Sequence, residues 1–569
     1  MWSIARHEVE EVQMAYLRGA DALVECLQAV GTKRVYGVIG TSIVGFMDAL
    51  YDARGAIRYI SCRHEQVAGS MADAEGRLTR RPGVVALHSG PGALNAMISL
   101  ANAAKDCSPV IAIAGSIKRR LQGCDGMLEL DHVRVFRPLC RGTYRVEATY
   151  EIPAIFSQAY KAAMAGPGGP VLIEVPEDIW GDRDEVNLEA LDLSVEPSPP
   201  ISQDDVQQVA ERLLQASRPV ILAGGGVAYT HAEDLLRQLA EKWQIPVATT
   251  GNGRGALSEL HPLSVGRAGY GGGNPVADQA LKQADLILGI GCTLSDMTTY
   301  EYTWPIQGEV VVVNLDTDND LKKTPLRAIY ADARDFLSRL TQALDSFPGA
   351  DRSSWISDLE PVKAMWENLL SSSRTPERTP VSPAYVCHTL GQMLADDAII
   401  TVGAGMHLLY PMAFTPSRQP RTFLSAVNFG AMGFGFPASL AAKLVYPERT
   451  VVAVLGDGDF LMTVQDLETA VREKIAVKIM VINDNAYRVL AFRQQVHYQG
   501  RIYGTLHGNP DLIRLAESFG LPAWRIEKPD AVESVLKEAL ASSDPALIEV
   551  ITDPQDIPPT NLEAVMGMR

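Results

Sequence analysis

The feature of this sequence that most restricts its fold is a repeated pairing of short β-branched runs with amphipathic segments. Runs such as GVVALHSG, PVILAGGG and TVVAVLGDG end in glycine or a polar turn, and apolar residues at helical spacing follow. Strands that end in glycine and lead into helices are typical of parallel sheets covered by helices on both faces. The sequence therefore predicts an α/β fold built from doubly wound parallel sheets.

Two polar, proline-rich stretches divide this pattern into three blocks. LDLSVEPSPPISQDD (191–205) and LLSSSRTPERTPVSP (369–383) lack periodicity and are predicted to be linkers. We therefore expect three doubly wound domains, an N-terminal one over 1–190, a central one over 200–368 and a C-terminal one over 384–569. The first and third blocks are similar in size and texture, but the sequence alone does not establish an internal repeat.

Composition argues against several classes of partner. The 569 residues are 47% hydrophobic and 21% charged, as in ordinary globular proteins. The net charge of −17 disfavours nucleic acid and anionic membranes, and no apolar run is long enough to span a bilayer. The seven cysteines form no CxxC pair, and the N-terminal MWSIARHEVEEVQM lacks the apolar core of a signal peptide. We expect a cytoplasmic protein with reduced thiols.

The stretch LGDGDFLMTVQDLETAVREKIAVKIMVINDNAY (455–487) carries the most specific chemistry. The apolar runs at 450–455 and 477–482 are predicted strands joined by an amphipathic helix. Asp457 and Asp484 follow these strands, so both are expected at the carboxyl edge of one sheet, where open α/β sheets bind ligands. Their oxygens, with glycine N–H groups nearby, suit a hard cation carrying phosphates. Two polar turns after core strands are the alternative.

Five motifs in order resemble those of thiamine-diphosphate-dependent enzymes. GDG (456–458) with NDN (483–485) resembles the cofactor-binding motif of that family, and RHEQVAGSMADAEGRLT (63–79) resembles its catalytic-glutamate segment. LHSGPGALNAMISLANA, GPGGPVLIEVPEDI and FGAMGFGFPASLAAKL match further landmarks. The resemblance covers essentially the whole chain and is closest to acetolactate-synthase-like and benzoylformate-decarboxylase-like enzymes.

This resemblance implies a pyrimidine-binding domain, a central domain and a diphosphate-binding domain, in a homodimer or homotetramer with active sites between subunits. It implies thiamine diphosphate and Mg²⁺ as cofactors. The implied reaction is decarboxylation of a 2-oxo acid, followed by release of an aldehyde or ligation to a second carbonyl compound. Some relatives retain FAD, which nothing in this sequence supports. The identity of the 2-oxo acid is not encoded in any motif.

Carried over motif by motif, the resemblance gives Mg²⁺ the carboxylates of Asp457 and Asp484 and the backbone carbonyl of Ala486. Asn485 competes with Asp484 as ligand if the register slips by one residue. Met432 would lie between the two cofactor rings, although methionine is more often a core residue. The remaining cofactor contacts implied are the N–H groups of Gly458 and Asp459, together with Gly403, Asn485, Tyr487 and Asn95, which could equally cap its own segment.

Four residues are implied in catalysis or substrate binding. Glu65 would accept a hydrogen bond from the cofactor's aminopyrimidine, unless it is only a helix-dipole partner. His88 matches the proton relay of benzoylformate decarboxylases, although a histidine beside a glycine turn is often structural. Thr41 takes the place of a glycine or serine in relatives. Arg493 would bind a carboxylate or phosphate unless it faces solvent.

Three positions depart from biosynthetic acetolactate synthases and argue against that activity. Leu128 replaces a glutamine, Glu177 a lysine and Arg493 a tryptophan. A 2-hydroxyacyl-CoA or oxalyl-CoA lyase on the same scaffold is the alternative, with KRRLQG (118–123) and the glycine turn in AGGGVAYTH as candidate CoA contacts. A non-catalytic subunit is disfavoured because Glu65 and both cofactor motifs are intact.

Overall fold

The computed structural model describes residues 14–198, 200–270, 273–316 and 327–560, so the predicted leader-free N-terminus (1–13) lies outside the described residues. The chain forms two compact units. The first runs to Gly76 and resumes from Arg81 to Glu196, and the second holds Arg77–Arg80 and the chain from Pro197 onward. Both units are α/β, and each predicted block contains one six-stranded sheet whose neighbouring strands are all parallel, which confirms the predicted fold.

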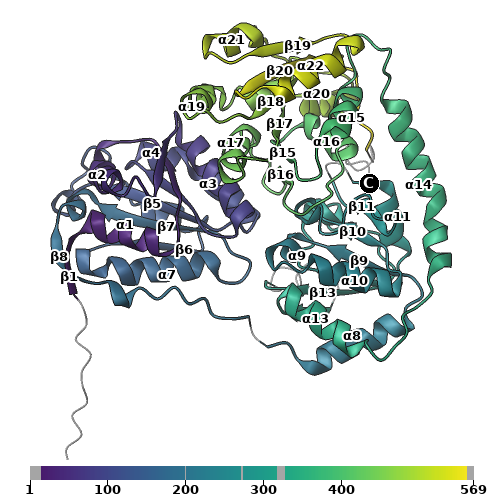
Figure 1. Cartoon of the computed structure of the whole chain (residues 1–569), viewed down its shortest axis with the longest axis horizontal. Coiled ribbons are helices and arrows are strands. Elements are labelled where there is room, and N and C mark those ends of the chain that lie inside the picture. The colour runs from purple at the N-terminus through teal and green to yellow at the C-terminus, as the bar shows by residue number, and fades with distance from the viewer. Residues whose placement is uncertain (1–13, 199, 271–272, 317–326, 561–569) are drawn as a thin grey trace, which may run out of the picture. The chain divides into compact units, whose positions relative to one another are not determined.

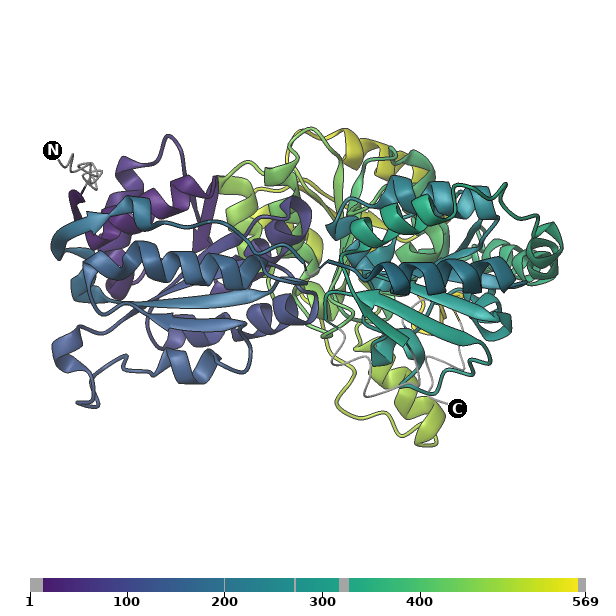
Figure 2. The same cartoon turned by 90° about the horizontal axis from the view of Figure 1, so that it is seen from below.

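The sheet of the first unit has the order β3-β2-β4-β5-β7-β6. Helices α1 (Gly19–Ala29), α2 (Val44–Asp52) and α7 (Ile152–Met164) bury their apolar sides on one face of it. Figure 2 shows α7 lying lengthwise along this sheet. A short antiparallel pair, β1 (Met14–Arg18) with β8 (Arg183–Asn187), stands apart. The six strands are β2 (Arg34–Gly37), β3 (Arg58–Ser61), β4 (Gly83–Leu87), β5 (Val110–Ser116), β6 (Gly142–Arg145) and β7 (Pro170–Pro176).

The central sheet of the second unit has the order β11-β10-β9-β12-β13-β14. Successive side chains of its strands point to opposite faces, so the sheet is apolar on both. Figure 1 shows the helices that cover these faces, α8 (Gln203–Gln215), α10 (Glu233–Trp243) and α13 (Ala333–Ala343) on one, α11 (Pro275–Gln283) and α14 (Ser353–Ser373) on the other. The strands are β9 (Pro219–Ala223), β10 (Val247–Thr249), β11 (Ser264–Arg267), β12 (Leu286–Ile290), β13 (Glu309–Asn314) and β14 (Arg327–Tyr330).

The second predicted linker is partly wrong, because α14 continues through Ser373 before the irregular segment begins. Leu370 explains the difference, since it packs against buried clusters of both the central and the C-terminal sheet. An apolar contact made on both sides stabilises helical residues whose polar composition suggested a linker. Among the described helices, none is both long and apolar enough to cross a bilayer.

The C-terminal sheet has the order β16-β15-β17-β18-β20-β19. The strands predicted at 450–455 and 477–482 are β17 and β18, each starting one residue later than predicted. The helix predicted between them is shorter, a 3₁₀ turn followed by α19 (Leu467–Arg472). The strands are β15 (Ile399–Val402), β16 (Phe423–Ser425), β17 (Val451–Gly456), β18 (Lys478–Asn483), β19 (Ala523–Ile526) and β20 (Ala546–Ile551).

The first and last sheets share one topology. In each, the first strand of the sheet lies between the second and the third, and the last two strands are exchanged. From the first strand the chain adds the second strand on one side, and then places the third strand on the opposite side. This reversal lies between β2 and β4 in the first sheet and between β15 and β17 in the last sheet. Open α/β sheets bind ligands beyond the carboxyl ends of the strands at such a reversal.

Candidate active site

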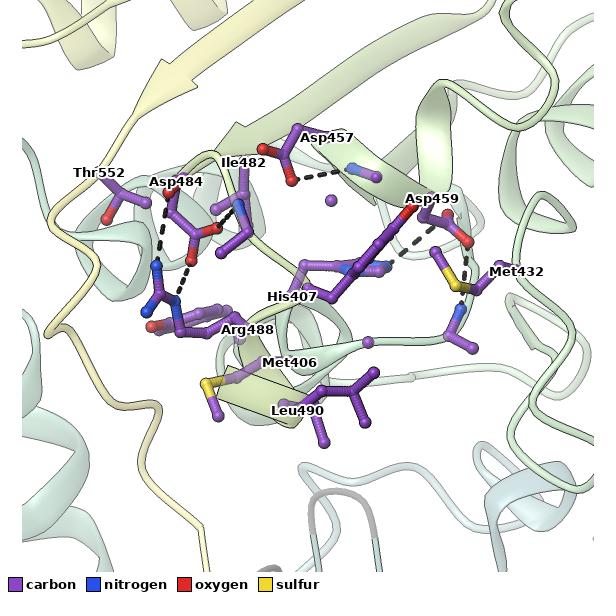
Figure 3. A pocket seen from close by; sticks show the side chains of 18 of the residues that line it. Met406, His407, Met432, Asp457, Asp459, Ile482, Asp484, Arg488, Leu490 and Thr552 are labelled. Carbon is purple, nitrogen blue, oxygen red and sulfur yellow. Dashed lines mark hydrogen bonds and ion pairs between the residues drawn. The ribbon is translucent and has the colours of Figure 1, made fainter. Parts of the chain in front are cut away.

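A cavity of about 260 Å³ lies at the reversal point of the C-terminal sheet. Segments that follow five strands of the sheet line it: residues 404–407 after β15, Gly430 and Met432 after β16, 457–459 after β17, Asp484 with 486–490 after β18, and Thr552, Asp553 and Asp556 after β20. Figure 3 shows their side chains converging on the cavity. Parallel strands end at the same edge of a sheet, and this is why turns far apart in sequence meet here.

Asp457 and Asp484 lie at the ends of the neighbouring strands β17 and β18, and both line the cavity. The Asp457 carboxylate accepts hydrogen bonds from the Gly458 N–H at 2.8 Å and from Asn509 Nδ2 at 2.7 Å. Burial raises the pKa of Asp484, and the negative charge of Asp457 adds to that rise. Arg488 acts against it, because its Nε donates to Asp484 Oδ2 at 2.6 Å.

Asp459 and His407 are two buried polar side chains on the wall of the same cavity. Asp459 Oδ1 accepts the N–H groups of Gly433 at 2.8 Å and Ala404 at 3.3 Å. Among the described residues, Asp459 Oδ2 and His407 Nε2 have no hydrogen-bond partner, and they lie 3.9 Å apart. Burial raises the pKa of Asp459 to about 7 and lowers that of His407 to about 3. Buried polar atoms without partners are what a polar ligand would satisfy.

The charges on the described lining residues test which ligand fits this cavity. Five aspartates and one arginine line it, and two of the aspartates, Asp553 and Asp556, are paired with Arg378 at 2.6 and 3.0 Å. A diphosphate would be repelled by the remaining carboxylates unless a cation entered with it. Carboxylate and carbonyl oxygens at the ends of β17 and β18 are the hard ligands that Mg²⁺ prefers. The residues present fit a divalent cation and a diphosphate together.

The other predicted site residues lie in two places, around this cavity and in the first unit around Glu65. Met432, Gly458, Tyr487 and the Ala486 backbone line the cavity with the aspartates. Gly403 lies just behind it, where an added Cβ would approach the Asp459 carboxylate to 2.1 Å, so only glycine fits. Asn485 and Arg493 are not among the lining residues.

The backbone of Asn485 takes a positive φ of 55° in the turn, and Arg493 is exposed on α20 (Arg488–His497). The guanidinium that does line the cavity is that of Arg488, and sequence reasoning missed it, together with His407. The available signal for Arg488 was its spacing, four residues after Asp484 at a helix start.

The first unit holds the other group of predicted residues, centred on Glu65. Glu65 begins α3 (Glu65–Thr79), is 8% exposed, and accepts a hydrogen bond from Asn95 Nδ2 at 2.9 Å. The backbone of Gly92 passes close beside it, because a Cβ on that glycine would lie 2.9 Å from Glu65 Oε1. The structure thus brings two of the predicted residues, Glu65 and Asn95, into direct contact.

His88 lies at the reversal point of this first sheet, directly after β4. Ser42, which sequence reasoning missed, follows β2 and faces it, with Ser42 Oγ 2.9 Å from His88 Nδ1. Thr41 is exposed beside Ser42. Burial lowers the pKa of His88, while the charges of Glu65 and Glu177 act in the opposite direction.

A buried histidine and glutamate hold the glycine turn that follows His88. The Gly90 N–H donates to His132 Nε2 at 3.1 Å, so the neutral imidazole carries its hydrogen on Nδ1 and donates to Glu174 Oε2 at 3.0 Å. Burial alone would raise the pKa of Glu174, but the hydrogen bonds from His132 and from Arg145, at 2.7 Å, outweigh it and keep that pKa low. This network ties the turn after β4 to buried hydrogen-bond partners.

The features named as candidate CoA contacts make local contacts within the protein. Arg119, in the KRRLQG segment, donates from Nε to Asp178 at 2.9 Å, and Lys118 lies 3.6 Å from Glu177. In the glycine turn after β9, a Cβ on Gly224 would lie 2.1 Å from the carbonyl oxygen of Gly291, so these two turns pack directly on each other.

Comparison with known proteins accounts for both groups of residues. The N-terminal TPP-binding domain of thiamine pyrophosphate enzymes matches residues 17–135, their central domain matches 206–340, and their C-terminal TPP-binding domain matches 403–550. Most of the residues that line the cavity, Asp457 and Asp484 among them, lie within the last of these matches, and Glu65 with His88 within the first.

Similar proteins span the whole chain. The probable acetolactate synthase large subunit of Methanocaldococcus jannaschii is 33% identical over 559 residues, which cover 95% of this chain and 93% of that protein. The acetolactate synthase isozyme 1 large subunit of Escherichia coli is 31% identical over 547 residues, covering 95% and 94%. The acetolactate synthase large subunit of Buchnera aphidicola is 30% identical over 570 residues, covering 98% and 97%. The chain therefore belongs to the family of thiamine-pyrophosphate-dependent enzymes that includes the acetolactate synthase large subunits.

Proposed function

We propose that this protein is a thiamine-diphosphate- and Mg²⁺-dependent enzyme that decarboxylates a 2-oxo acid and then ligates the remaining fragment to a second carbonyl compound or releases it as an aldehyde. The observation that carries the proposal is the meeting of Asp457 and Asp484 in an acidic cavity at the reversal point of the C-terminal sheet. Bound thiamine diphosphate supplies the nucleophilic carbon and the electron sink for breaking a bond next to a carbonyl.

In this proposal, the residues of the cavity bind and orient the cofactor. The carboxylates of Asp457 and Asp484 and the carbonyl of Ala486 would hold Mg²⁺. The backbone N–H group of Asp459 would face the diphosphate, whereas the N–H predicted for this role at Gly458 is held by the Asp457 carboxylate at 2.8 Å. Met432 would contact the rings. The next residue, Gly433, donates its N–H to the Asp459 carboxylate, which fixes the backbone at this point.

Glu65 and His88 would handle protons in the first unit. Glu65, held by Asn95, would bind a protonated ring nitrogen of the cofactor through its carboxylate. His88 would give a proton to the product or take one from the substrate. We propose that Glu65 of one subunit works with the cavity of another subunit in a homodimer or homotetramer, as the family resemblance implies.

The donor and acceptor are proposed to differ from those of biosynthetic acetolactate synthases. Two of the departures from those enzymes lie around His88. The charge of the Glu177 side chain raises the pKa of His88. Leu128 lies beside the same turn, where its backbone carbonyl accepts the hydroxyl of Ser89 at 2.8 Å, a contact that does not depend on its side chain. A changed environment of the proton-handling histidine supports a changed substrate.

The seven cysteines are free thiols, which suits the reducing cytoplasm that we propose as the location.

The test is CO₂ release from a panel of 2-oxo acids, with and without added thiamine diphosphate and Mg²⁺. Cofactor-dependent release from one member of the panel, with an aldehyde or acyloin as co-product, is expected. Protein that binds the cofactor but releases CO₂ from none of them would contradict decarboxylation and move the assignment to cleavage of an acyl-CoA or acyloin substrate.

A further inference from the structure

Arg488 is the one permanently charged cation among the described residues that line the C-terminal cavity. Its side chain is 16% exposed, so most of it is out of contact with solvent. A guanidinium placed at such a wall attracts anions, because it presents several N–H donors in a fixed planar fork. Arg488 is also the first residue of α20, and the positive end of that helix dipole favours anions at the same place.

Asp484 fixes the orientation of this guanidinium through one nitrogen and leaves its other nitrogens available to a ligand. Arg488 Nε donates to Asp484 Oδ2 at 2.6 Å, and Nη2 makes only a long contact of 3.4 Å with the Asp484 carbonyl oxygen. Arg488 Nη1 makes no hydrogen bond to any described residue. The pairing through Nε fixes the plane of the fork, so the two Nη nitrogens remain for a ligand.

The position of Arg488 in the cavity indicates which part of the cofactor it can reach. Figure 3 shows Arg488 and Asp484 on one side of the cavity, and Met432 with Asp459 on the opposite side. If Met432 contacts the rings of the cofactor, as proposed above, the Arg488 side receives groups that lie away from them. A cavity with five aspartates binds a multiply charged anion only where cations meet it, and Arg488 is such a cation.

We infer that Arg488 is an anion-binding residue of this cavity, whose Nη nitrogens bind a phosphate or carboxylate oxygen of the ligand while Asp484 holds the guanidinium in place. The inference rests on the proposed function, since it deepens the binding site of that proposal. The two sources of the anion are the diphosphate of the cofactor, which the placement opposite Met432 favours, and the carboxylate of the 2-oxo acid, and the experiment distinguishes them.

The experiment measures dissociation constants by calorimetry for two probes with saturating Mg²⁺, thiamine diphosphate and inorganic pyrophosphate. The KM and kcat for the 2-oxo acid are measured alongside. The variants are Arg488→Met, which removes all donors, and Arg488→Lys, which keeps a cation beside Asp484 and so protects the fold. Arg339→Met is the matched control, because Arg339 Nε pairs with Asp335 at 2.9 Å, also four residues earlier, on α13, and Arg339 does not line the cavity.

For Arg488→Met we expect binding of pyrophosphate and of thiamine diphosphate to weaken about 10- to 100-fold, as for a lost charge-assisted hydrogen bond. Arg488→Lys should lose part of this affinity and Arg339→Met none. If both dissociation constants stay unchanged while KM rises at least about tenfold with kcat retained, the anion is the substrate carboxylate.

The inference is overturned if Arg488→Met leaves both dissociation constants and KM within about twofold of the wild type, a difference too small for a lost charged contact. Failure of the proposed function would look different. Wild-type protein would then release no CO₂ from any 2-oxo acid, while the effect of Arg488→Met on pyrophosphate binding would still decide the role of the arginine.

Discussion

Two contacts from Ser42 decide which ring nitrogen of His88 carries the hydrogen. Ser42 Oγ accepts the N–H of Ser89 at 2.9 Å, and the Ser42 N–H itself lies 3.4 Å from His88 Nδ1. With an N–H already directed at Nδ1, that nitrogen must be an acceptor, so the Ser42 hydroxyl donates to it. The neutral ring then carries its hydrogen on Nε2. Burial lowers the pKa of His88, so near neutral pH it is an uncharged donor.

Ser42→Ala should move the pH profile of kcat/KM. Loss of the hydroxyl removes a donor that stabilises neutral His88, so the pKa of His88 rises toward its ordinary value of about 6.5. As pH falls, His88 becomes charged earlier than in the wild type, and the acidic limb of the profile shifts to higher pH. The measurement is kcat/KM from pH 5 upward, about the range in which histidine titrates.

Ser157→Ala is the control for this change. Ser157 is also buried, donates to the Pro153 carbonyl at 2.7 Å and accepts the Asp192 N–H at 2.9 Å, but it does not contact His88. Its profile should match the wild type. Superimposable profiles for Ser42→Ala and Ser157→Ala would show that Ser42 does not set the state of His88.

Glu65→Gln should abolish turnover and leave the fold intact. Glutamine has nearly the same shape and keeps an oxygen to accept the hydrogen bond from Asn95, but it lacks the negative charge that would stabilise a protonated ring nitrogen. We expect kcat to fall at least about 100-fold, with an unchanged circular dichroism spectrum and melting temperature. Near-normal activity in this variant would rule out the carboxylate role proposed for Glu65.

At the scale of elements, the turn after β4 depends on a short helix that packs beside it. Helix α6 (His132–Phe136) places His132 between Gly90 and Glu174. The side chains of His132 and Glu174 are buried, with exposures of 0% and 1%. Gly90 has a positive φ of 64°, which favours glycine, so the N–H that His132 receives points in a fixed direction. The strand β7 and the helix α6 thus support the turn that carries His88.

His132→Phe should lower the free energy of unfolding by about 1–3 kcal/mol, because a buried N–H and a buried carboxylate oxygen each lose a partner. His132→Gln can both accept from Gly90 and donate to Glu174, so it should recover part of that stability. Urea denaturation of the three proteins measures the difference. Equal midpoints and slopes for all three would mean that this network contributes nothing to stability.

At the scale of the whole molecule, the same strand order places a candidate site in each of two sheets. The reversal point of the first sheet carries His88 and Ser42, and that of the C-terminal sheet carries Asp457 and the cavity. The sequence blocks were similar in texture, but only the topology reveals the correspondence. Neither set of residues alone contains both the proton-handling groups and the cation site, so the proposed enzyme needs both.

Mixing two inactive variants tests whether the two sets come from different subunits. Glu65→Gln and Asp457→Ala are each expected to be inactive. In a hybrid dimer with shared sites, one site contains both substitutions and the other contains neither, so random reassortment restores about one quarter of wild-type activity. Activity that stays at background in purified hybrids, identified by different affinity tags, would place both sets in one subunit.

The sequence alone determined the α/β class, the three parallel sheets, and the meeting of Asp457 with Asp484 at one edge. These follow from local periodicity and from the rule that parallel strands end at the same edge, which require no knowledge of side-chain packing. It also led to Glu65 and Asn95 through motif resemblance. Helical residues beyond Leu369 were missed because their stability comes from the contacts of Leu370, which composition does not reveal.

Only the tertiary structure decided which side chains line the cavity. The sequence predicts Arg493 as the anion-binding residue, yet Arg488 lines the cavity and Arg493 is exposed. Five residues along a helix turn a side chain by about 140°, so the two arginines cannot face the same way. Likewise, Ser42 reaches His88 across 46 residues of chain. Such contacts depend on how strands and helices pack, which no single segment of sequence specifies.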